Sequence, residues 1–383
     1  MSNNIRPIAM YLPQFHPIPE NDEWWGKGFT EWTNVAKAKP LFSGHFQPNL
    51  PGELGFYDLR VPEVREQQAA LARKYGIEGF MYWHYWFAGK RILERPFKEV
   101  LESGKPDFPF CLGWANESWQ GNWHGLSAKK MLIEQTYPGG KDYEQHFYSI
   151  LPAFKDKRYI TVDDKPLFVV YHPAYIPNCR NFVEEWQELA MQNGLKGIYF
   201  VGIVLKIDEH KEAINLGFDA THSSGLGAPI ELLYKQKNIN TLIYNIKRRL
   251  MLYGLNWKYT SKGVFKYEDF IKYHLEYQQQ SISKNIENQE NIFPEIFPKW
   301  DNSPRAGYNS LIIKDATPEK FRTHVKEIFN LVKNKPVEKK IVFIKSWNEW
   351  AEGNYMEPDQ KFGRKWLEVF KEEVELFNKN KKI

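Results

Sequence analysis

The chain has 383 residues, a formal net charge of +5 and a hydrophobic fraction of 42%, which is enough apolar material for a full core. No apolar run approaches the roughly 18 to 20 residues that cross a bilayer, so the sequence excludes a membrane-spanning helix. Two cysteines, Cys111 and Cys179, are too few for a disulfide framework and fit free thiols in a reducing compartment.

Residues 1–6 lack the basic start, apolar core and small-residue cleavage site of a signal peptide, so we expect a cytoplasmic protein. Aromatic residues make up 16% of the chain, which is high for an ordinary domain. Aromatics beyond the needs of a core usually line a site for flat or apolar-faced ligands. Carbohydrate, as an oligosaccharide or polysaccharide, is therefore the first ligand to consider.

Eight short apolar runs alternate with helical patterns along the chain, which is the order expected of a parallel sheet with crossover helices. The runs are rich in Ile, Val, Phe and Tyr, as strands buried on both faces should be. We predict an α/β fold of the (β/α)8 TIM barrel class, as a single domain over residues 1–383. The predicted strands are 7–12, 79–83, 108–114, 166–171, 197–203, 218–222, 292–297 and 341–346.

Three intervening segments carry clear helix signals. Pro62 suits a first helical position because its missing amide proton would be unpaired there anyway, and Gly76 is the residue favoured just past a helix end. Residues 318–334 repeat the proline start and place an apolar stripe on one face. Residues 362–377 are predicted to form the closing helix.

Two connections are too long for simple turns. Residues 13–58, after the first strand, are rich in proline and tryptophan, the composition of an ordered irregular loop, and we expect them to form a wall of a binding site. Residues 225–291, before the seventh strand, are predicted to be a helical insertion with helices near 241–252 and 267–281.

Basic charge concentrates in this insertion. Between Lys235 and Lys284, ten lysines or arginines stand against three acidic residues, a net charge of +7 that leaves the rest of the chain near neutral. The segment could approach an anionic membrane surface, which would make the protein peripheral at the inner membrane, or bind an anionic polysaccharide. A solvated helical insertion is the plain alternative.

Polar and aromatic residues gather where several predicted strands end, and in a barrel these ends meet at one face. A single aromatic run is more often core than ligand platform, but clusters after strands two, three and four together favour a site. Near strand seven, Asp301 and Arg305 could bond sugar hydroxyls or pair with each other. The residues predicted to contact a ligand are Tyr11, Gln14, Trp32, His84, Trp114, Asn116, Glu117, His172, Trp300, Asp301, Arg305, Trp347 and Asn348.

The sequence gives little support for a metal or a nucleotide cofactor. His16, His84, His172 and His222 are scattered without His-x-His or His-x-x-x-His spacing. There is no Gly-x-Gly-x-x-Gly fingerprint and no P-loop, which weakens, without excluding, a nucleotide-sugar transferase of the doubly wound type. We predict no metal, no cofactor and no nucleic-acid partner.

Two glutamates three residues apart directly follow the last predicted strand. Glu349 and Glu352 are flanked by Trp347 and Trp350, and tryptophan suits the apolar face of a sugar ring and can raise a carboxyl pKa by desolvation. A lone Glu-x-x-Glu is more often solvated surface charge. With Trp-Asn before it and Gly353 after it, the motif favours chemistry.

The spacing of the pair also restricts the chemistry. Glycosidases generally use two carboxyl groups around the anomeric carbon, whereas Glu349 and Glu352 in one turn would share a face. Either a third carboxylate, Glu117 or Asp301, completes the pair, or one glutamate acts on a substrate hydroxyl instead.

Several longer motifs stand out in the chain: Tyr11-Leu12-Pro13-Gln14-Phe15-His16, Asn21-Asp22-Glu23-Trp24-Trp25-Gly26, Gly28-Phe29-Thr30-Glu31-Trp32, Trp300-Asp301-Asn302 and Trp347-Asn348-Glu349-Trp350. Together they resemble the WbsX-type family of bacterial polysaccharide clusters, which is similar to glycoside hydrolase family 99, the endo-acting α-mannosidases. The resemblance covers residues 7–358, and the basic insertion is its least matched part.

The resemblance implies a (β/α)8 barrel, no metal, and retention of configuration through the substrate's own 2-hydroxyl. Carried over, Glu349 would deprotonate that hydroxyl and Glu352 would be the general acid and base, on α-mannosides or α-rhamnosides. The sequence departs from family 99 at Ala351 and in residues 225–291, which leaves the sugar open. WbsX-type proteins are often labelled glycosyltransferases of O-antigen, lipopolysaccharide or capsule synthesis. Glycosidase, transglycosidase, glycosyltransferase and non-catalytic glycan-binding barrel are therefore the hypotheses to weigh.

Overall fold

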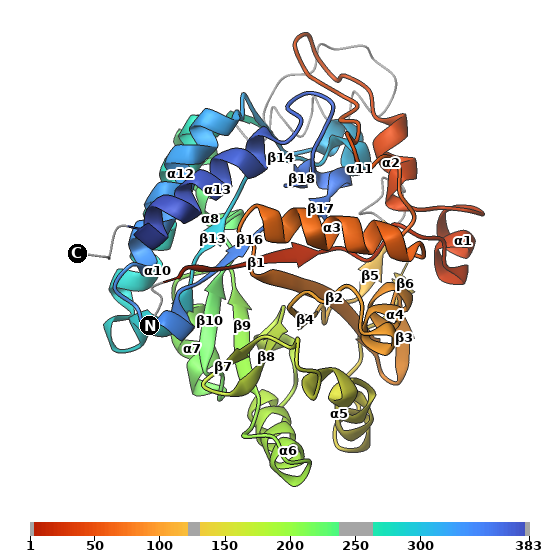
Figure 1. Cartoon of the computed structure of the whole chain (residues 1–383), viewed down its shortest axis with the longest axis vertical. Coiled ribbons are helices and arrows are strands. Elements are labelled where there is room, and N and C mark those ends of the chain that lie inside the picture. Colours follow the sequence, from red (N-terminus) through yellow and green to blue (C-terminus); the bar gives the residue numbers. More distant parts are fainter. Residues whose placement is uncertain (1–3, 122–130, 237–262, 380–383) are drawn as a thin grey trace.

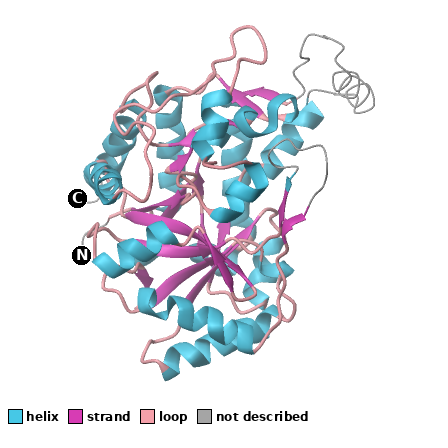
Figure 2. Cartoon of the chain, turned by 90° about the vertical axis from the view of Figure 1, so that its right-hand side faces the viewer, coloured by secondary structure: helices cyan, strands magenta, loops and turns pink. Residues whose placement is uncertain are grey.

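Residues 4–121, 131–236 and 263–379 are described by the computed structural model (Figure 1). Nine parallel strands form a nearly closed barrel, and helices surround it, so the predicted (β/α)8 barrel is confirmed (Figure 2). Each of the eight predicted runs overlaps a barrel strand. In spatial order the strands are β12 (Ile292–Phe293), β10 (Ala220–Ser223), β9 (Tyr199–Val204), β8 (Lys165–Val170), β4 (Phe110–Trp114), β2 (Gly79–Phe87), β1 (Arg6–Tyr11), β16 (Ile341–Ile344) and β13 (Glu295–Ile296).

The seventh strand of the barrel is split into β12 and β13, and the split closes the sheet. β12 pairs with β10, whereas β13 pairs with β16 on the other side. Pro294 lies between the two pieces, and a proline has no amide hydrogen to continue a ladder. Its carbonyl oxygen still accepts a hydrogen bond from the amide of Phe343 at 3.1 Å. The chain itself therefore joins the two edges of the sheet.

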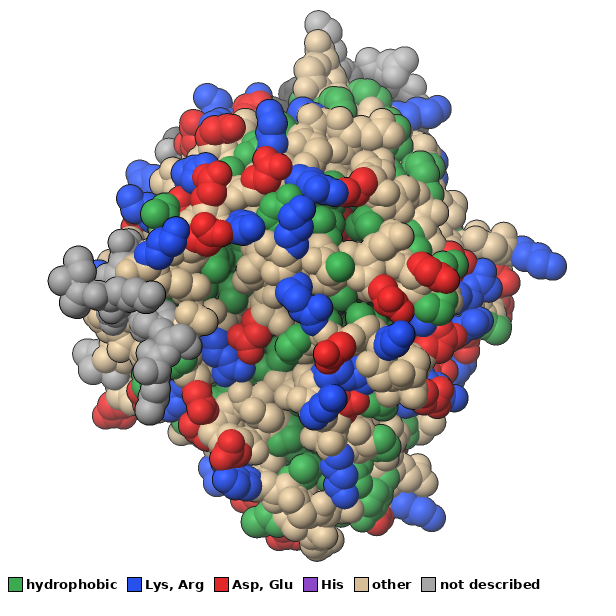
Figure 3. All heavy atoms as spheres, viewed as in Figure 1, with side chains coloured by type: hydrophobic (Ala, Val, Ile, Leu, Met, Phe, Trp, Pro, Cys, Tyr) green, Lys and Arg blue, Asp and Glu red, His purple; other side chains and the backbone are tan. Residues whose placement is uncertain are grey.

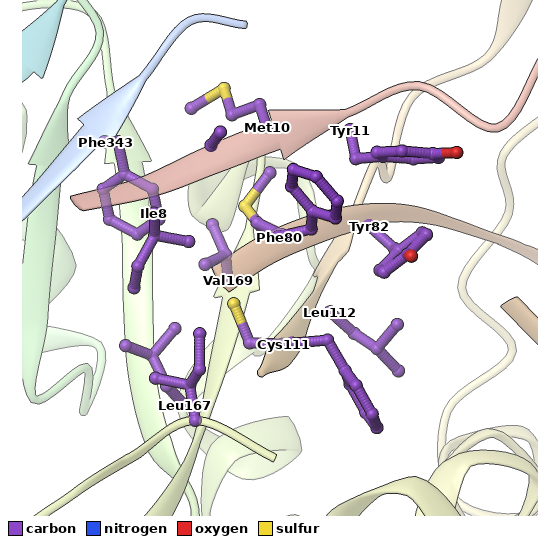
Figure 4. Packing of buried hydrophobic residues seen from close by; sticks show 14 of the residues in the cluster. Ile8, Met10, Tyr11, Phe80, Tyr82, Cys111, Leu112, Leu167, Val169 and Phe343 are labelled. Carbon is purple, nitrogen blue, oxygen red and sulfur yellow. The ribbon is translucent and has the colours of Figure 1, made fainter. Parts of the chain in front are cut away.

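Side chains alternate between the barrel interior and the surrounding helices, as the period of a strand requires (Figure 4). Ile8 pairs in register with Phe343, and Met10 with Met81, along the interior. Tyr11 has the opposite orientation, because its hydroxyl donates to Gln68 of helix α3 at 2.7 Å. Both sets are buried, so the two faces of each strand have the same apolar character.

The predicted helices over 62–76, 318–334 and 362–377 are present as α3 (Pro62–Lys74), α12 (Pro318–Val332) and α13 (Lys365–Lys379). Helices α12 and α13 lie side by side (Figure 1). The other long helices are α4 (Arg95–Ser103), α5 (Lys141–Phe154), α6 (Cys179–Gln192), α8 (Gly227–Gln236) and α10 (Tyr267–Lys284). Among the described residues no helix is both long enough and apolar enough to cross a membrane.

The insertion before the seventh strand differs in part from the prediction. The helix expected over 267–281 is α10, but the one expected over 241–252 lies outside the described residues. The segment also contributes a strand, β11 (Val264–Lys266), which pairs with β15 (Ile312–Lys314); β15 in turn pairs with β14 (Trp300–Asp301). This small sheet packs against α10.

The long connection after β1 carries two short helices, α1 (Pro19–Trp25) and α2 (Glu31–Lys37), on the side of the barrel where the strands end (Figure 1). On the face seen in Figure 3, acidic and basic side chains are interspersed rather than separated. The remaining short elements are α7 (Glu209–Asn215), α11 (Ser303–Ala306), β3 (Lys90–Ile92), β5 (Trp119–Gln120), β6 (Met131–Ile133), β7 (Thr161–Val162), β17 (Asn348–Glu349) and β18 (Asn354–Tyr355).

Gly79, the first residue of β2, tests how tightly the barrel is packed. A Cβ there would lie 2.5 Å from the carbonyl oxygen of Pro109, so we expect Gly79→Ala to lower the free energy of unfolding by about 1–3 kcal/mol. Gly227→Ala is the control, because nothing lies within 4 Å of the position that its methyl group would take. Urea titration followed by tryptophan fluorescence measures both; equal stabilities would contradict the packing.

Candidate active site

A cavity of about 520 Å³ opens at the carboxyl ends of the barrel strands. In a barrel of this class, that is the face on which ligands bind. Five of the residues predicted from the sequence line it, and they come from four separate segments of the chain. They are Gln14, Glu117, Arg305, Glu349 and Glu352.

The two glutamates sit on a tight hairpin that follows β16. Strands β17 and β18 pair through Asn348 with Tyr355, and the single turn between them carries Glu352. Gly353 ends this turn at φ 62°, where a Cβ would lie 2.8 Å from Asp301 N. Only glycine fits that close approach, which explains the Gly after the motif.

Arg305 binds both members of the pair. Its Nη1 donates to Glu352 at 2.7 Å and its Nη2 lies 3.2 Å from Glu349. Its Nε donates to Glu31 of α2 at 3.1 Å. One guanidinium therefore holds three carboxylates, and Glu31 is fully buried. Glu31 was not among the predicted site residues, because nothing in the sequence shows that residue 31 would meet residue 305.

Burial separates the two glutamates. Glu349 is 8% exposed, whereas Glu352 is half-buried. Desolvation, with the neighbouring charge of Glu352 second, raises the pKa of Glu349 to about 8, although Arg305 acts to lower it. A carboxyl with a pKa near neutrality is suited to exchanging protons with a substrate.

Another buried acid, Glu357, anchors the hairpin. Its carboxylate accepts from Trp350 Nε1 at 2.6 Å, from Gln68 Nε2 at 2.6 Å and from Tyr57 Oη at 2.8 Å. Burial raises its pKa to about 7. Since Trp350 stands between the two catalytic candidates in the chain, this network fixes the turn that carries them.

The tryptophans and the asparagine of the motif have structural contacts. Trp347 is fully buried and Trp350 is 1% exposed, so neither offers a face to a sugar, contrary to the prediction. Asn348 is also fully buried, and its side-chain amide bonds the backbone of Leu12 at 2.7 and 3.0 Å. It ties the hairpin to the end of β1 rather than reaching a ligand.

Aromatic side chains line the cavity from the predicted clusters at the ends of strands two, three and four, although none of them was among the individual residues predicted to contact a ligand. Trp83 and Tyr85 of β2 face it, together with Trp119 and Tyr171. Trp83 meets Tyr171 edge-on at 5.7 Å between ring centroids, and Tyr85 meets Trp119 at 5.1 Å. This aromatic wall gives the cavity an apolar surface that suits flat or apolar-faced ligands.

Two predicted contact residues on the barrel strands point away from the cavity. His84 is buried against His146 of α5, at 2.8 Å between ring nitrogens. Trp114 is also buried, and its indole donates to the carbonyl oxygen of Trp86 at 3.2 Å. Both belong to the strand face that packs under helices, so the predicted ligand contact is wrong for them.

Two further predicted residues are also buried in the core. Tyr11 points at α3 through its bond to Gln68. Trp32 of α2 is buried and donates to the carbonyl oxygen of Tyr57 at 2.7 Å. This bond joins two distant parts of the long connection after β1. Neither lines the cavity, so the predicted ligand contact is wrong for both of them.

The residues that follow the third barrel strand include one that lines the cavity, Glu117, and one that holds the backbone there, Asn116. Asn116 is fully buried and its side-chain amide bonds the backbone of His172 at 2.8 and 2.9 Å, which ties two strand ends together. The His172 ring lies 3.6 Å from Glu117, which lines the cavity. Of the three predicted residues here, only Glu117 faces the main cavity.

Trp300 and Asp301 line a separate, smaller hollow of about 140 Å³ behind the hairpin. Asp301 accepts from Gln47 at 2.6 Å and contacts His45 at 2.8 Å. It therefore does not pair with Arg305, and it is not a third carboxylate of the main cavity. Within the described part of the chain, no group of three or more His, Cys, Asp or Glu side chains is placed to hold a metal ion.

Comparison with known proteins shows the family to which the chain belongs. The family model described as "Glycosyltransferase WbsX" matches residues 7–370. The chain belongs to the WbsX family. Two proteins named WxcX, from Xanthomonas campestris pv. campestris strains B100 and ATCC 33913, are each 34% identical to it over 94% of its length. The chain spans about half the length of these curated relatives, 48% of each.

The fold of this WbsX-family chain is also that of solved glycoside hydrolases. It is similar to the family 99 endo-α-mannosidase from Bacteroides thetaiotaomicron in complex with bis-tris propane, with a TM-score of 0.58 over 98% of both chains. It is similar to a glycoside hydrolase-like protein with a TM-score of 0.62, over 97% of this chain and 94% of the other. Both are 14% identical to it, so the likeness concerns the fold, and the resemblance seen in the sequence is confirmed.

Removing the anchor of the hairpin should destabilise the WbsX-family barrel. Glu357→Ala leaves three buried donors without an acceptor, each worth about 1–3 kcal/mol, so we expect the free energy of unfolding to fall by at least about 3 kcal/mol. Glu184→Ala, on the exposed face of α6, should change it by less than about 0.5 kcal/mol. Denaturant titration measures both, and similar values for the two variants would refute the anchoring role.

Proposed function

We propose that this protein is an enzyme of bacterial surface polysaccharide metabolism that cleaves or transfers an α-manno- or α-rhamno-configured glycosidic bond with retention. The observation that carries the proposal is the carboxylate pair on one guanidinium, in an open cavity with an aromatic wall. The WbsX family and the family 99 barrel support the substrate class. A cytoplasmic location remains part of the proposal.

The roles of the two glutamates follow from their environments. We assign Glu349 as the base for the substrate's 2-hydroxyl, since its raised pKa makes it a stronger base than an ordinary carboxylate. We assign Glu352, whose side chain is the more exposed of the two, as the acid and base for the leaving and entering groups. Both act from one side, as two residues on a single turn must.

In the first step Glu349 takes the proton of the 2-hydroxyl, O2 forms a bond to C1, and the C1–O bond to the leaving sugar breaks as Glu352 protonates that oxygen. In the second step Glu352 takes a proton from water or an acceptor hydroxyl, whose oxygen bonds C1. The C1–O2 bond then breaks and Glu349 returns the proton to O2. Two inversions at C1 give net retention.

Arg305 allows Glu349 and Glu352 to lie close together. Two carboxylates held close together would otherwise share one proton, because like charges oppose each other's ionisation. The guanidinium compensates their charge, and Glu31 behind it fixes its orientation. The description of the family as a glycosyltransferase favours a second candidate, transfer to a sugar acceptor in place of water. The same residues serve both, because only the nucleophile of the second step differs.

Glu352→Gln and Glu349→Gln test the assignment. Each should lower turnover by about 10²–10⁴-fold, the usual contribution of a general acid or base, while glycan binding persists. The measurement is product analysis of host polysaccharide and lipid-linked glycans, with and without nucleotide sugars. Glu184→Gln on the surface is the control. Binding without turnover in the native protein would make it a non-catalytic glycan-binding barrel, and products only with a nucleotide sugar would make it a glycosyltransferase.

The pH dependence gives a second test. A base acts only when ionised, so kcat/KM should rise with pH and reach half its maximum near the pKa of Glu349, about 8. Arg305→Met removes a charge that lowers this pKa and should move the rise to higher pH. Glu31→Gln removes a charge that raises it and should move the rise to lower pH. Shifts in the same direction for both variants would exclude Glu349 as the titrating base.

A further inference from the structure

Lys345 is a cavity residue that the proposed reaction does not use. It directly follows β16, and its backbone amide donates to the carbonyl oxygen of Ile296 at 3.0 Å. This bond fixes its backbone to the end of the barrel sheet. The side chain is half-buried and lines the cavity beside Ser346 and Glu349. Its ammonium lies 5.8 Å from the centroid of the Trp300 ring.

The ammonium has no carboxylate partner within the described ranges of the chain, where no acidic oxygen comes within 4.0 Å of it. Glu349 is already bound by Arg305. Glu295, the other acid whose field it feels, already contacts His222 at 3.4 Å and His274 at 3.6 Å. A half-buried cation without a counter-ion is costly unless a ligand or water completes it.

Gln14, just after the neighbouring strand β1, provides a second hydrogen-bond donor. It follows β1, which pairs with β16, and it lines the same cavity although only 5% of it is exposed. Its side-chain amide has no hydrogen-bond partner among the side chains and backbone of residues 4–121, 131–236 and 263–379. The ammonium and the amide line one cavity and both donate hydrogen bonds, which the two oxygens of a carboxylate accept.

We propose that Lys345 and Gln14 bind the carboxylate of an acidic sugar, so that the substrate is an acidic polysaccharide containing uronic acid units. This inference rests on the proposed function for its site but adds a substrate class to it. A single negative charge fits better than a phosphate dianion, because Glu117, Glu349 and Glu352 line the same cavity and would repel the larger charge more strongly.

The test compares two ligands that differ only in the carboxylate, methyl α-D-mannopyranosiduronate and methyl α-D-mannopyranoside, by saturation-transfer NMR titration of the full chain at low salt. The native protein should bind the uronate about tenfold more tightly, the value of one charge-assisted hydrogen bond. Lys345→Met should abolish the preference, Lys345→Arg should keep it, and Gln14→Leu should reduce it. Lys361→Met is the control, because that lysine lies over Phe46 at the smaller hollow.

Equal affinity of the native protein for the two ligands would overturn the proposal, as would a preference that survives in Lys345→Met. Tighter binding of α-D-mannose 1-phosphate than of the uronate would also overturn it, in favour of a phosphate site. A Lys345→Met variant that shifts the pH profile of activity and leaves the ratio of the two affinities unchanged would overturn it too, because Lys345 would then only adjust Glu349. Because the titration needs no turnover, its outcome is separate from that of the Glu352→Gln assay.

Discussion

One guanidinium determines what the cavity can do. Arg305 reaches Glu31, Glu349 and Glu352 from a four-residue helix, and without it three carboxylates would stand together in a partly dehydrated space. Such a cluster could exist only with several of its members protonated. Arg305 makes its shortest contact with Glu352. Glu349 is more deeply buried and has a pKa of about 8. The pKa of Glu349 is therefore set first by its own burial and then by the charges of the cluster around it.

The rest of the hairpin serves to hold this cluster still. Asn348 bonds the backbone at the end of β1, and Glu357 accepts from three donors, one of which is Trp350. These bonds are buried, so breaking any of them leaves a polar group without a partner. The apolar residues of the motif are consequently framework, and the aromatic surface that a sugar would meet comes from other strand ends, with Trp83 and Tyr85 among its residues.

The sequence was sufficient for the architecture because each barrel strand is an apolar run buried on both faces, and such runs are visible without knowledge of their neighbours. The same property hides the orientation of the side chains. His84 looks as suitable for a site as Trp83 and Tyr85, yet only the last two face the cavity. Long-range pairs are hidden for a different reason. The meeting of Glu31 with Arg305 depends on the path of two loops, and neither the spacing nor the composition of those loops records it.

The charges that line the cavity also link ligand binding to the ionisation of Glu349. In the proposed reaction, a neutral sugar that enters beside Glu349 would remove water from it and favour the protonated carboxyl, whereas the proposed base must be ionised. Arg305 and Lys345 are the two cations that line the cavity in the described chain, and both favour the ionised form of Glu349. Arg305 is committed to three acids, so the ammonium of Lys345 is the one that a ligand can engage. A substrate carboxylate on Lys345 would partly cancel its field and raise the pKa of Glu349 further, so binding and basicity are coupled through a single side chain.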